Sequence, residues 1–403
     1  MKPLEGIKVV ELAAYVAAPA AARLLGELGA EVIKIEGPKG DANRGLGAIN
    51  NAPYTDDCNP IFDTTNFNKE FICVDTKKPE GKAILFKLLE TADVFITNYR
   101  SNVLVKMGLD YETIKDKYPR LVWAQCLGFG EQGPEKDTAG FDFTAYGARG
   151  GLAGSVGQEG VPINGINAFG DTQTSQAITI GIIAALLGRE KTGKGDKVTG
   201  SLHNVACYNL HWGIIGAYYG SHYPKSRKNV FQPLINVYEC SDGAWVQLCG
   251  AAYDAYLPKA AKALGLEKEL LEDERYNKYT TVCANASQPE VIKILDSGFA
   301  KKTADEWVVA FRAADCPLEK CYTFDDVLKD EQAYASGILE KVTYPNGSEG
   351  VIVNNPVRLG ATAGCKPVPS KGIGADTYAI LLKEGWSQAE LDELAAAGVI
   401  KQK

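Results

Sequence analysis

The sequence predicts an α/β protein with a doubly wound parallel sheet and a second, smaller domain. Short apolar runs alternate with helix-forming segments through the first 200 residues, which is typical of parallel strands joined by crossover helices. The pattern changes near residue 225, where a hairpin and several helices follow one another. We therefore expect a large domain over residues 1–225, a small domain over 226–330, and a return to the large domain over 331–403.

The amino-terminal segment predicts the first strand–helix–strand unit. Ile7–Leu12 is a short apolar run, Ala20–Leu28 contains helix formers, and Glu31–Ile35 resumes a strand. Pro19 suits the first helical position, and Gly29 suits the residue just past the helix end. The connection is long enough for a crossover, so we expect the two strands to be parallel.

Further strands and helices continue this alternation. The expected strands are Phe71–Asp75, Asp93–Thr97, Leu121–Cys126 and Lys197–Leu202. The expected helices are Glu80–Thr91, Tyr111–Lys117 and Thr172–Leu187. Between them, residues 128–170 are rich in glycine and have little periodicity, which indicates loops.

The second domain is expected to start with a hairpin. Two apolar strands, Leu234–Glu239 and Ala244–Leu248, flank the turn residues 241–243. Expected helices follow at about 251–264, 288–300 and 304–313, and Thr303 with Glu306 forms a capping box for the last of them. The return to the large domain is expected to contain a hairpin over Leu339–Val353 and a helical segment at 374–400.

Charge and composition exclude several functional classes. The 43 Lys and Arg against 50 Asp and Glu give a net charge of −7, which does not favour binding to nucleic acid or to an anionic membrane. No apolar run reaches the length of about 18 residues that a membrane span needs, and we expect no signal peptide. The ten cysteines include no Cys-x-x-Cys pair, so we expect free thiols and a cytoplasmic location. With three histidines and no clustered ligands, we expect no metal.

The segment Gly128–Gly133 matches the pattern G-x-G-x-x-G and follows an expected strand. A dinucleotide-binding fingerprint should continue directly into an apolar helix. Here the next residues, 134–140, are polar and begin with proline. We therefore interpret the glycines as a loop that shapes a pocket wall.

Asp171 is the strongest candidate for a catalytic residue. It follows Phe169-Gly170 and directly precedes the expected helix, so one interpretation is a structural N-cap, which is worth about 1 kcal/mol. The other interpretation is a covalent nucleophile, because the helix dipole should keep the carboxylate ionised and Gly170 allows a substrate to approach the backbone. The residues alone leave both interpretations open.

Two further groups of residues lie where ligands gather in doubly wound sheets. Asn98, Tyr99 and Arg100 follow the end of an expected strand, with Lys106 and Met107 a little further on. Asp142 lies between two aromatic residues in the glycine-rich region. The cations could contact phosphates, although exposed cations on a helix are usually only solvated.

Several segments taken together resemble the class III CoA-transferases, which include formyl-CoA:oxalate and carnitine CoA-transferases. Each segment is weak alone, but all occur in order along nearly the whole chain. They are Leu4–Glu11, Gly29–Glu36, Gly40–Gly45, Gly170-Asp171, Ala184–Arg189, Lys191–Gly195 and Gly374–Thr377.

The resemblance implies a Rossmann-like large domain built from both chain ends, a smaller inserted α+β domain, and an interlocked homodimer. It places the family's nucleophilic aspartate on Asp171. The implied reaction passes through an aspartyl anhydride and an aspartyl-CoA thioester and needs no metal. Residues that match family positions near coenzyme A are Asn98, Tyr99, Lys106 and Met107.

The implied substrates are an acyl-CoA or enoyl-CoA donor and a carboxylic acid acceptor. Members specific for oxalate have polar residues where this chain has Ala14 and Val16, so an apolar acyl pocket is implied, with Asp142 beside it. Within the family, the resemblance is greatest to clostridial-type transferases of amino-acid fermentation that act on 2-hydroxy acids such as phenyllactate and 2-hydroxyisocaproate. Segments 108–113 and 193–199 are among those that carry it.

Two alternative functions are kept. Acyl-CoA racemases are similar in fold and move an α-proton with a His/Asp pair, but this chain has Phe141 at the histidine position. Phenylalanine cannot act as a base, which argues against racemisation. The other alternative is a non-catalytic acyl-CoA-binding homologue, in which Asp171 is only a helix cap.

Overall fold

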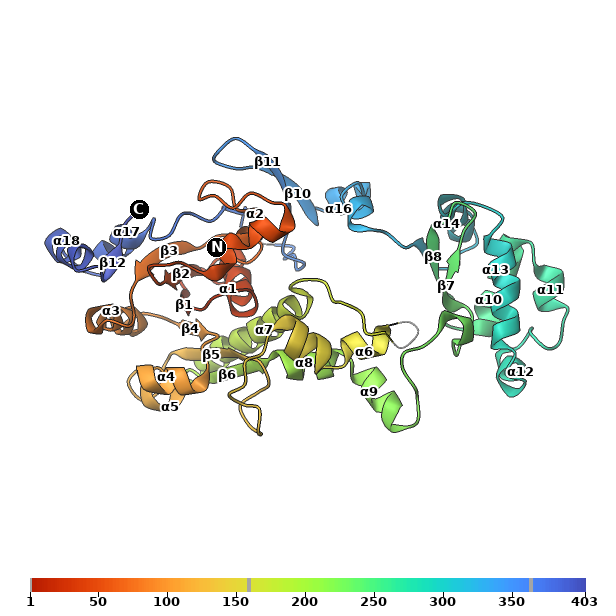
Figure 1. Cartoon of the computed structure of the whole chain (residues 1–403), viewed down its shortest axis with the longest axis horizontal. Coiled ribbons are helices and arrows are strands. Elements are labelled where there is room, and N and C mark those ends of the chain that lie inside the picture. Colours follow the sequence, from red (N-terminus) through yellow and green to blue (C-terminus); the bar gives the residue numbers. More distant parts are fainter. Residues whose placement is uncertain (1, 158–160, 362–364) are drawn as a thin grey trace. The chain divides into compact units, whose positions relative to one another are not determined.

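The computed structural model describes residues 2–157, 161–361 and 365–403 (Figure 1). The chain divides into two compact units. The large unit comprises residues 1–153, 164–219 and 332–403, and the small unit comprises 154–163 and 220–331. Both ends of the chain therefore belong to the large unit.

A seven-stranded sheet forms the centre of the large unit, with the strand order β12-β3-β2-β1-β4-β5-β6. All pairs are parallel except that of β12 with β3, which is antiparallel. The order 3-2-1-4-5-6 is that of a Rossmann sheet, so the expected doubly wound α/β fold is confirmed. The strands are β1 (Lys8–Leu12), β2 (Glu31–Glu36), β3 (Glu70–Val74), β4 (Val94–Thr97), β5 (Val122–Leu127), β6 (Lys197–Ser201) and β12 (Ile400–Lys401).

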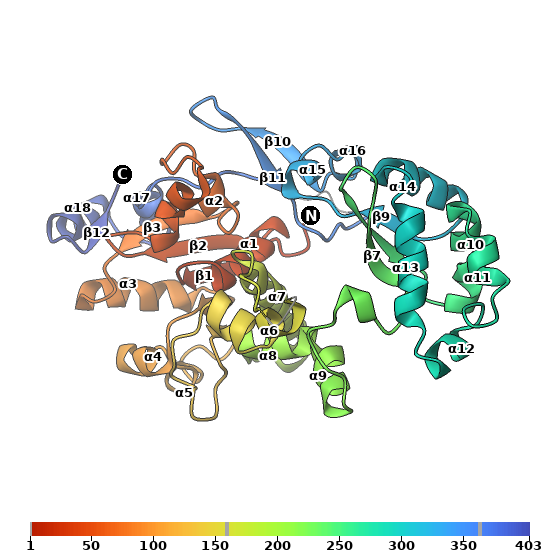
Figure 2. The ribbon, with the colours of Figure 1, turned by 45° about the vertical axis from the view of Figure 1, so that its right-hand side comes forward.

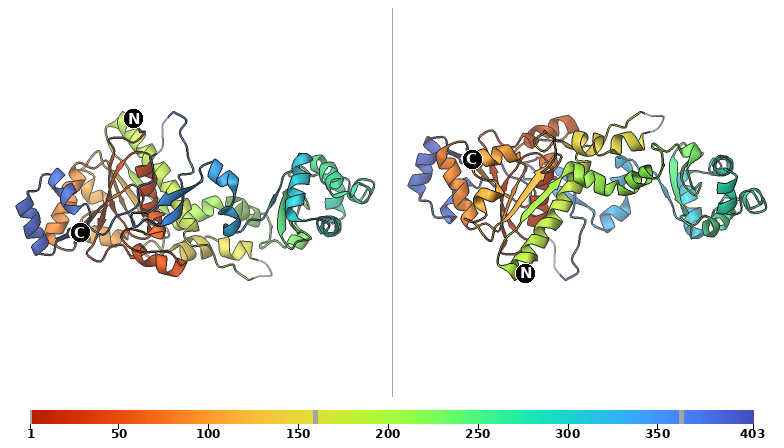
Figure 3. Two further views of the ribbon diagram at one scale, coloured as in Figure 1. Left: turned by 90° about the horizontal axis from the view of Figure 1, so that it is seen from above. Right: turned by 90° about the horizontal axis from the view of Figure 1, so that it is seen from below.

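Helices cover both faces of this sheet because its strands are apolar on both faces (Figure 2). Val9 packs in the same cluster as residues of α1 (Ala17–Glu27) and α7 (Phe169–Thr192). Val10, the next residue of β1, packs on the opposite face with residues of the helices α3 (Pro79–Glu90), α17 (Thr377–Lys383) and α18 (Gln388–Ala396). Both views in Figure 3 show the blue carboxyl-terminal helices beside the orange helix α3.

Shorter elements complete the large unit. The helices are α2 (Pro60–Asp63), α4 (Ser101–Met107), α5 (Tyr111–Ile114), α8 (Leu202–Asn209) and α9 (His211–Tyr218), with a 3₁₀ helix at Ala42–Asn50 and a π-helix at Asp142–Ala148. The expected hairpin is confirmed as β10 (Leu339–Thr343) and β11 (Glu349–Val353). The short helices α6 (Leu152–Val156) and α16 (Glu331–Ala335) lie where the chain passes between the units.

The small unit has its own core. Its antiparallel sheet contains β7 (Ile235–Glu239), β8 (Trp245–Cys249) and β9 (Leu318–Lys320). Its helices are α10 (Tyr253–Leu264), α11 (Glu267–Leu271), α12 (Tyr279–Ala284), α13 (Gln288–Phe299), α14 (Ala304–Ala313) and α15 (Phe324–Val327), with a 3₁₀ turn at Arg227–Asn229. Phe299 stacks on Tyr238 at 4.8 Å between ring centroids, inside the apolar cluster. The capping box of Thr303 and Glu306 is confirmed.

Two expectations about helix starts are wrong. Helix α1 begins at Ala17, so Pro19 is not its first residue, although Gly29 does follow the helix end with a φ of +106°. Helix α7 begins at Phe169 after Ala168, whose φ is +66°. Asp171 is therefore the third residue inside the helix, and it does not cap it.

Other properties of the chain bear on its environment. All ten cysteines are free thiols in the structure. Among the described residues, no helix is long and apolar enough to cross a membrane.

Candidate active site

A cavity of about 850 Å³ opens at the carboxyl ends of the central strands of the large unit. Ala14 follows β1, Asn98 follows β4, and Leu127 ends β5, and all three line the cavity. The order of strands reverses between β1 and β4, and crevices at such a switch point bind ligands in open α/β sheets. The fold therefore places a binding site here on general grounds.

Asp171 lies on the wall of this cavity, in the first turn of α7. Its backbone position is fixed by Gly170, which packs so tightly that an added Cβ would lie 2.2 Å from Cγ of Tyr146. Only glycine fits at this position. The sequence motif Gly170-Asp171 thus has a local structural cause, since the glycine lets α7 start against the ring of Tyr146.

A second carboxylate lies at the start of the same helix. Asp142 is buried, and its Oδ1 accepts a hydrogen bond from the backbone N–H of Gly170 at 2.8 Å. The free N–H groups at the amino end of a helix attract an anion, and here the anion is Asp142. No residue that the structure describes donates a hydrogen bond to the side chain of Asp171.

The electrostatic setting of Asp171 differs from the sequence-based expectation of an easily ionised carboxylate. Burial, followed by the neighbouring charge of Asp142, raises the pKa of Asp171 to about 7. Burial also raises the pKa of Asp142, against the hydrogen bond from Gly170. Asp171 is therefore poised to change protonation near neutral pH, beside a second acid whose pKa is also raised.

Cys126 also lines the cavity, at the end of β5. Burial, and then the charge of Asp171, raise the pKa of this thiol far above its ordinary value. A neutral thiol is a poor nucleophile. Between these two neighbours, Asp171 is thus the group suited to attack a substrate.

The residues that the resemblance associates with coenzyme A separate into two pairs. Asn98 and Tyr99 line the cavity. Lys106 and Met107 lie in the last turn of α4 and do not line it. The side chain of Lys106 is exposed, whereas Met107 packs against the hydrophobic core.

The proposed acyl-pocket residues Ala14, Val16 and Asp142 all line the cavity. The structure adds lining residues that sequence reasoning did not single out. They are Tyr15, Asn43, Lys136 and Phe143. Lys136 lies in the loop that follows β5, and a cation in a loop beyond the carboxyl end of a strand is the signal that could have identified it.

The glycine-rich stretch forms part of the cavity wall. Gly128 and Gly140 line the cavity and face each other so closely that a Cβ built on Gly128 would lie 2.7 Å from the Cα of Gly140. No α-helix follows Gly133 before the π-helix at Asp142. Of the three glycines in the pattern, Gly128 lines the cavity, whereas Gly130 and Gly133 do not, and the apolar helix that a dinucleotide fingerprint requires is absent from this described segment.

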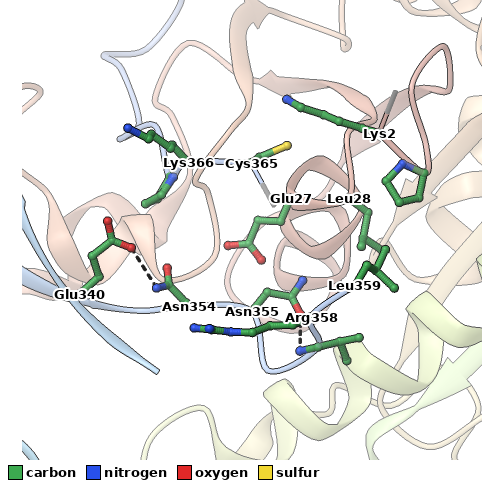
Figure 4. A pocket seen from close by; sticks show the side chains of 13 residues that line it. Lys2, Glu27, Leu28, Glu340, Asn354, Asn355, Arg358, Leu359, Cys365 and Lys366 are labelled. Carbon is green, nitrogen blue, oxygen red and sulfur yellow. Dashed lines mark hydrogen bonds between the residues drawn. The ribbon is translucent and has the colours of Figure 1, made fainter. Parts of the chain in front are cut away.

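A second cavity of about 410 Å³ also lies in the large unit, with mixed charges (Figure 4). Lys2, Glu27 and Arg358 are among its lining side chains, and it shares no residue with the cavity of Asp171. None of the candidate site residues from the sequence lines it.

Comparison with protein families decides the class of this site. Residues 4–377 match CoA-transferase family III. The chain belongs to this family. It is therefore a CoA-transferase, and CoA thioesters are its substrates.

Relatives within the family cover almost the whole chain. The chain is 42% identical over 399 residues to (R)-2-hydroxy-4-methylpentanoate CoA-transferase from Clostridioides difficile, with 99% of each chain covered. It is also 42% identical over 393 residues to cinnamoyl-CoA:phenyllactate CoA-transferase from Clostridium sporogenes, with 96% of this chain and 95% of the relative covered.

A solved structure agrees with the fold. The crystal structure of a CAIB/BAIF family protein from Brucella suis superposes with a TM-score of 0.79 at 30% identity, covering 95% of this chain and 99% of that one. The architecture expected from the resemblance, a Rossmann-like large domain with a smaller second domain, is confirmed.

Proposed function

We propose that the chain transfers CoA from an acyl-CoA or enoyl-CoA to a 2-hydroxy acid, with Asp171 as the covalent nucleophile. The observation that carries the proposal is the Asp171 carboxylate, which lies in the cavity at the switch point and receives no hydrogen bond from residues 2–157, 161–361 or 365–403. A carboxylate left free in this way can attack a carbonyl.

The proposed reaction conserves the thioester through two covalent intermediates. An oxygen of Asp171 attacks the carbonyl carbon of the donor thioester, and the C–S bond breaks to give a mixed anhydride and CoA thiolate. The thiolate attacks the aspartyl carbonyl of the anhydride, which releases the donor carboxylate and leaves an aspartyl-CoA thioester. The acceptor carboxylate then displaces the thiolate to form a second anhydride. The thiolate attacks the acceptor's carbonyl, which gives the new acyl-CoA and restores Asp171.

Each step builds negative charge on a carbonyl oxygen, which needs hydrogen-bond donors. The segment Leu127–Gly128 lines the cavity, and we assign its backbone N–H groups to this purpose. Apolar residues such as Val16, Phe141 and Phe143 line the cavity, and a bound acyl group packed against them would shield the anhydride from water.

The phosphates of coenzyme A need cations. Arg100 and Lys136 are exposed and line the cavity, and we assign them to the phosphate groups. Asn98 and Tyr99 would contact the remainder of the cofactor. Lys106 remains a candidate for contact with a phosphate group outside the cavity. Its side chain is exposed in the last turn of α4, the helix that follows Asn98 in the chain.

The choice of a 2-hydroxy acid rests on the two clostridial relatives, whose names specify 2-hydroxy-4-methylpentanoate and phenyllactate. Both acids carry a bulky apolar side chain. The cavity offers Val16, Phe141 and Phe143 to such a group.

The test is to incubate the protein with acetyl-CoA or cinnamoyl-CoA and a panel of carboxylates, and to identify the CoA products by mass. Transfer to 2-hydroxy acids is expected. Hydroxylamine added during turnover should convert Asp171 to a hydroxamate that peptide mass spectrometry locates. If a competent thioester never leads to labelling of Asp171, the proposed intermediates are wrong.

We also propose that the active protein is a homodimer. Helix α9 exposes a continuous apolar surface, with Trp212 and Tyr218 each 84% exposed. Apolar patches of this kind on a large unit are usually covered by a partner. Light scattering after size exclusion should give about twice the mass of 43.3 kDa, and a monomer would contradict the proposal.

The acyl-CoA racemase remains the second candidate function. Phe141 lies on the cavity wall at the position where a base is needed, and no histidine lines the described part of the cavity. Rapid α-deuteration of a chiral acyl-CoA in deuterated water would favour racemisation. A non-catalytic acyl-CoA-binding protein would instead bind thioesters without any exchange.

A further inference from the structure

Tyr15 has a strained backbone on the wall of the cavity. It follows β1 and has a φ of +67°, in the left-handed region that side chains other than glycine rarely adopt. Such a conformation is unfavourable and persists only where the surroundings fix it. Strained residues often have a functional role when they lie beside a binding site.

Two polar side chains hold the backbone of Tyr15 in this conformation. Oδ1 of Asp41 accepts a hydrogen bond from the Tyr15 N–H at 3.0 Å. Nδ2 of Asn43 donates to the Tyr15 carbonyl oxygen at 3.2 Å. Asp41 also accepts from the N–H of Asn43 at 2.9 Å, so the two side chains support each other.

The residues before Tyr15 are held in the same way. The amide of Asn98 accepts from the N–H of Ala14 and donates to its carbonyl oxygen, at 3.2 Å and 2.6 Å. Nζ of Lys34 donates to the carbonyl oxygen of Ala13 at 3.0 Å. Side chains thus contact every residue of the segment Ala13–Tyr15.

A buried group of charges stands behind this segment. Lys34 is fully buried and lies 2.7 Å from Glu11 and 3.0 Å from Asp41. Glu11 also pairs with the buried Lys69 at 2.7 Å. Burial lowers the pKa of Lys34, but Glu11, Asp41 and Glu36 together raise it above its ordinary value, so Lys34 is charged. Asp41 therefore has a fixed position, because any movement would separate it from a buried cation.

The side chain of Tyr15 meets Phe141 edge to face, with ring centroids 5.7 Å apart and an interplanar angle of 86°. Both rings remain substantially exposed to the cavity, at 43% for Tyr15 and 53% for Phe141. Phe141 directly precedes Asp142, which contacts the start of the helix of Asp171. The aromatic pair is therefore close in the structure to the reacting carboxylate.

We propose that Tyr15 determines acyl specificity, with its ring and that of Phe141 forming a wall that selects ring-bearing or branched apolar acyl groups over short ones. Asp41 is then a positioning residue, because it fixes the ring through the Tyr15 backbone. An apolar ring placed against an edge-to-face pair gains contact area that a methyl group does not. The proposal deepens the proposed function, since it concerns the acyl end of the same cavity.

The experiment compares phenyllactate with lactate as acceptors, using one donor thioester. Substitution of Tyr15→Ala should lower kcat/KM for phenyllactate about tenfold and that for lactate by less than about twofold, as expected for lost apolar contact in a pocket. Tyr15→Phe should preserve the ratio. Tyr54→Ala is the matched control, because Tyr54 is exposed and does not line the cavity. An equal effect of Tyr15→Ala on both acceptors, or no effect, overturns the proposal.

Tyr15→Gly provides a second variant if the alanine protein does not fold. Glycine removes the ring and also relieves the left-handed strain, so stability should rise while selectivity falls. A glycine variant that keeps the wild-type selectivity would overturn the role of the ring.

The positioning role of Asp41 is tested by Asp41→Asn, which keeps an acceptor oxygen for Tyr15 but removes the charge facing Lys34. The ratio of the two acceptors should fall by about threefold or more, and should not fall further when Tyr15→Ala is already present. A merely structural role would lower kcat/KM for both acceptors equally in either background, which would overturn the assignment.

Binding measurements separate this proposal from the proposed function. Calorimetry with cinnamoyl-CoA and acetyl-CoA requires no turnover. Tyr15→Ala should weaken cinnamoyl-CoA binding about tenfold and leave acetyl-CoA binding within about twofold. If no 2-hydroxy acid accepts CoA but this binding difference is found, the acceptor assignment fails and the aromatic wall stands. If acceptors react but binding and selectivity do not change, the wall fails alone.

Discussion

The side chain of Asp142 accepts a hydrogen bond from the backbone N–H of Gly170 at 2.8 Å. The carboxylate that binds the amino end of α7 is therefore that of Asp142 and not that of Asp171. A helix end favours one anion strongly, and a second carboxylate nearby is then repelled. Burial, and then the charge of Asp142, raise the pKa of Asp171 to about 7, and no residue that the structure describes donates a hydrogen bond to its side chain. The poorly solvated charge that makes Asp171 nucleophilic therefore also destabilises the folded protein.

Replacing Asp171 by asparagine should separate activity from stability. Asp171→Asn should lower CoA transfer by about 10³-fold or more, because the amide cannot form the anhydride. At pH 8 the variant should unfold at a higher temperature, with a gain of about 1–3 kcal/mol from losing a poorly solvated charge. Calorimetry and product analysis measure both effects.

The sign of this stability effect follows from the pKa. Since the folded-state pKa of about 7 lies above the ordinary 3.8, the stabilising effect of the proton is present below about pH 4 and is lost as the pH rises through 7. The advantage of Asp171→Asn should accordingly disappear at pH 4. Asp116→Asn, at an exposed position whose neighbours do not line the cavity, is the matched control and should change neither property.

The pH dependence of kcat/KM should reveal the interaction between the carboxyl groups of Asp171 and Asp142. Transfer needs ionised Asp171, so kcat/KM should rise with pH through about 7. Asp142→Asn keeps an acceptor for Gly170 but removes the like charge, and it should move this midpoint to lower pH. An unchanged or raised midpoint in the variant would show that Asp142 does not influence Asp171.

Alanine substitutions of two glycines in α7 should have opposite effects on the stability of the fold. A Cβ at Gly170 would lie 2.2 Å from Cγ of Tyr146 and 2.4 Å from Oδ1 of Asp142, whereas a Cβ at Gly188 meets nothing within 4 Å. Gly170→Ala should destabilise by about 2 kcal/mol or more and abolish transfer. Gly188→Ala should stabilise by about 0.5–1 kcal/mol through helix propensity. Urea unfolding of both variants checks this contrast, and equal effects would contradict the close packing at Gly170.

The buried charges behind Tyr15 should be sensitive to the loss of one partner. Lys34→Met leaves Glu11 and Asp41 with fewer cations in a fully buried setting, and should cost about 3–5 kcal/mol. Lys383→Met breaks the exposed pair with Glu31 and should cost less than about 1 kcal/mol. Urea midpoints of the two variants measure the difference. Similar losses would mean that burial does not control the energetics of these pairs.

Much of the fold could be predicted because its signals are local. The strands β1 to β5 are buried on both faces, so each is a short apolar run that stands out in the sequence. Helix α9 was not predicted as an element, because its residues are apolar on all sides and show no periodic face. Such a segment has no amphipathic pattern from which its helical form can be inferred.

The site was predictable only in part, because its decisive contacts join distant residues. The segment 169–171 could be located from glycine and aspartate, but the hydrogen bond of Asp142 to Gly170 spans 28 residues. Helix α7 begins at Phe169, earlier than expected, because Ala168 before it has a left-handed conformation. Alanine rarely adopts this conformation, so the sequence does not indicate it. The sequence gives no sign of the conformation of Tyr15 either, since Asp41 and Asn43, which hold its backbone, lie 26 and 28 residues away along the chain.

The pairing of β12 with β3 has a consequence for synthesis on the ribosome. Residues near position 400 bond to a strand made more than 300 residues earlier, so this edge of β3 stays open until residues near position 400 have been synthesised. During that interval the whole small unit is synthesised and has time to fold. During the same interval the edge of β3 can pair with strands of other chains, so the late arrival of β12 sets a window in which the nascent protein is prone to aggregate.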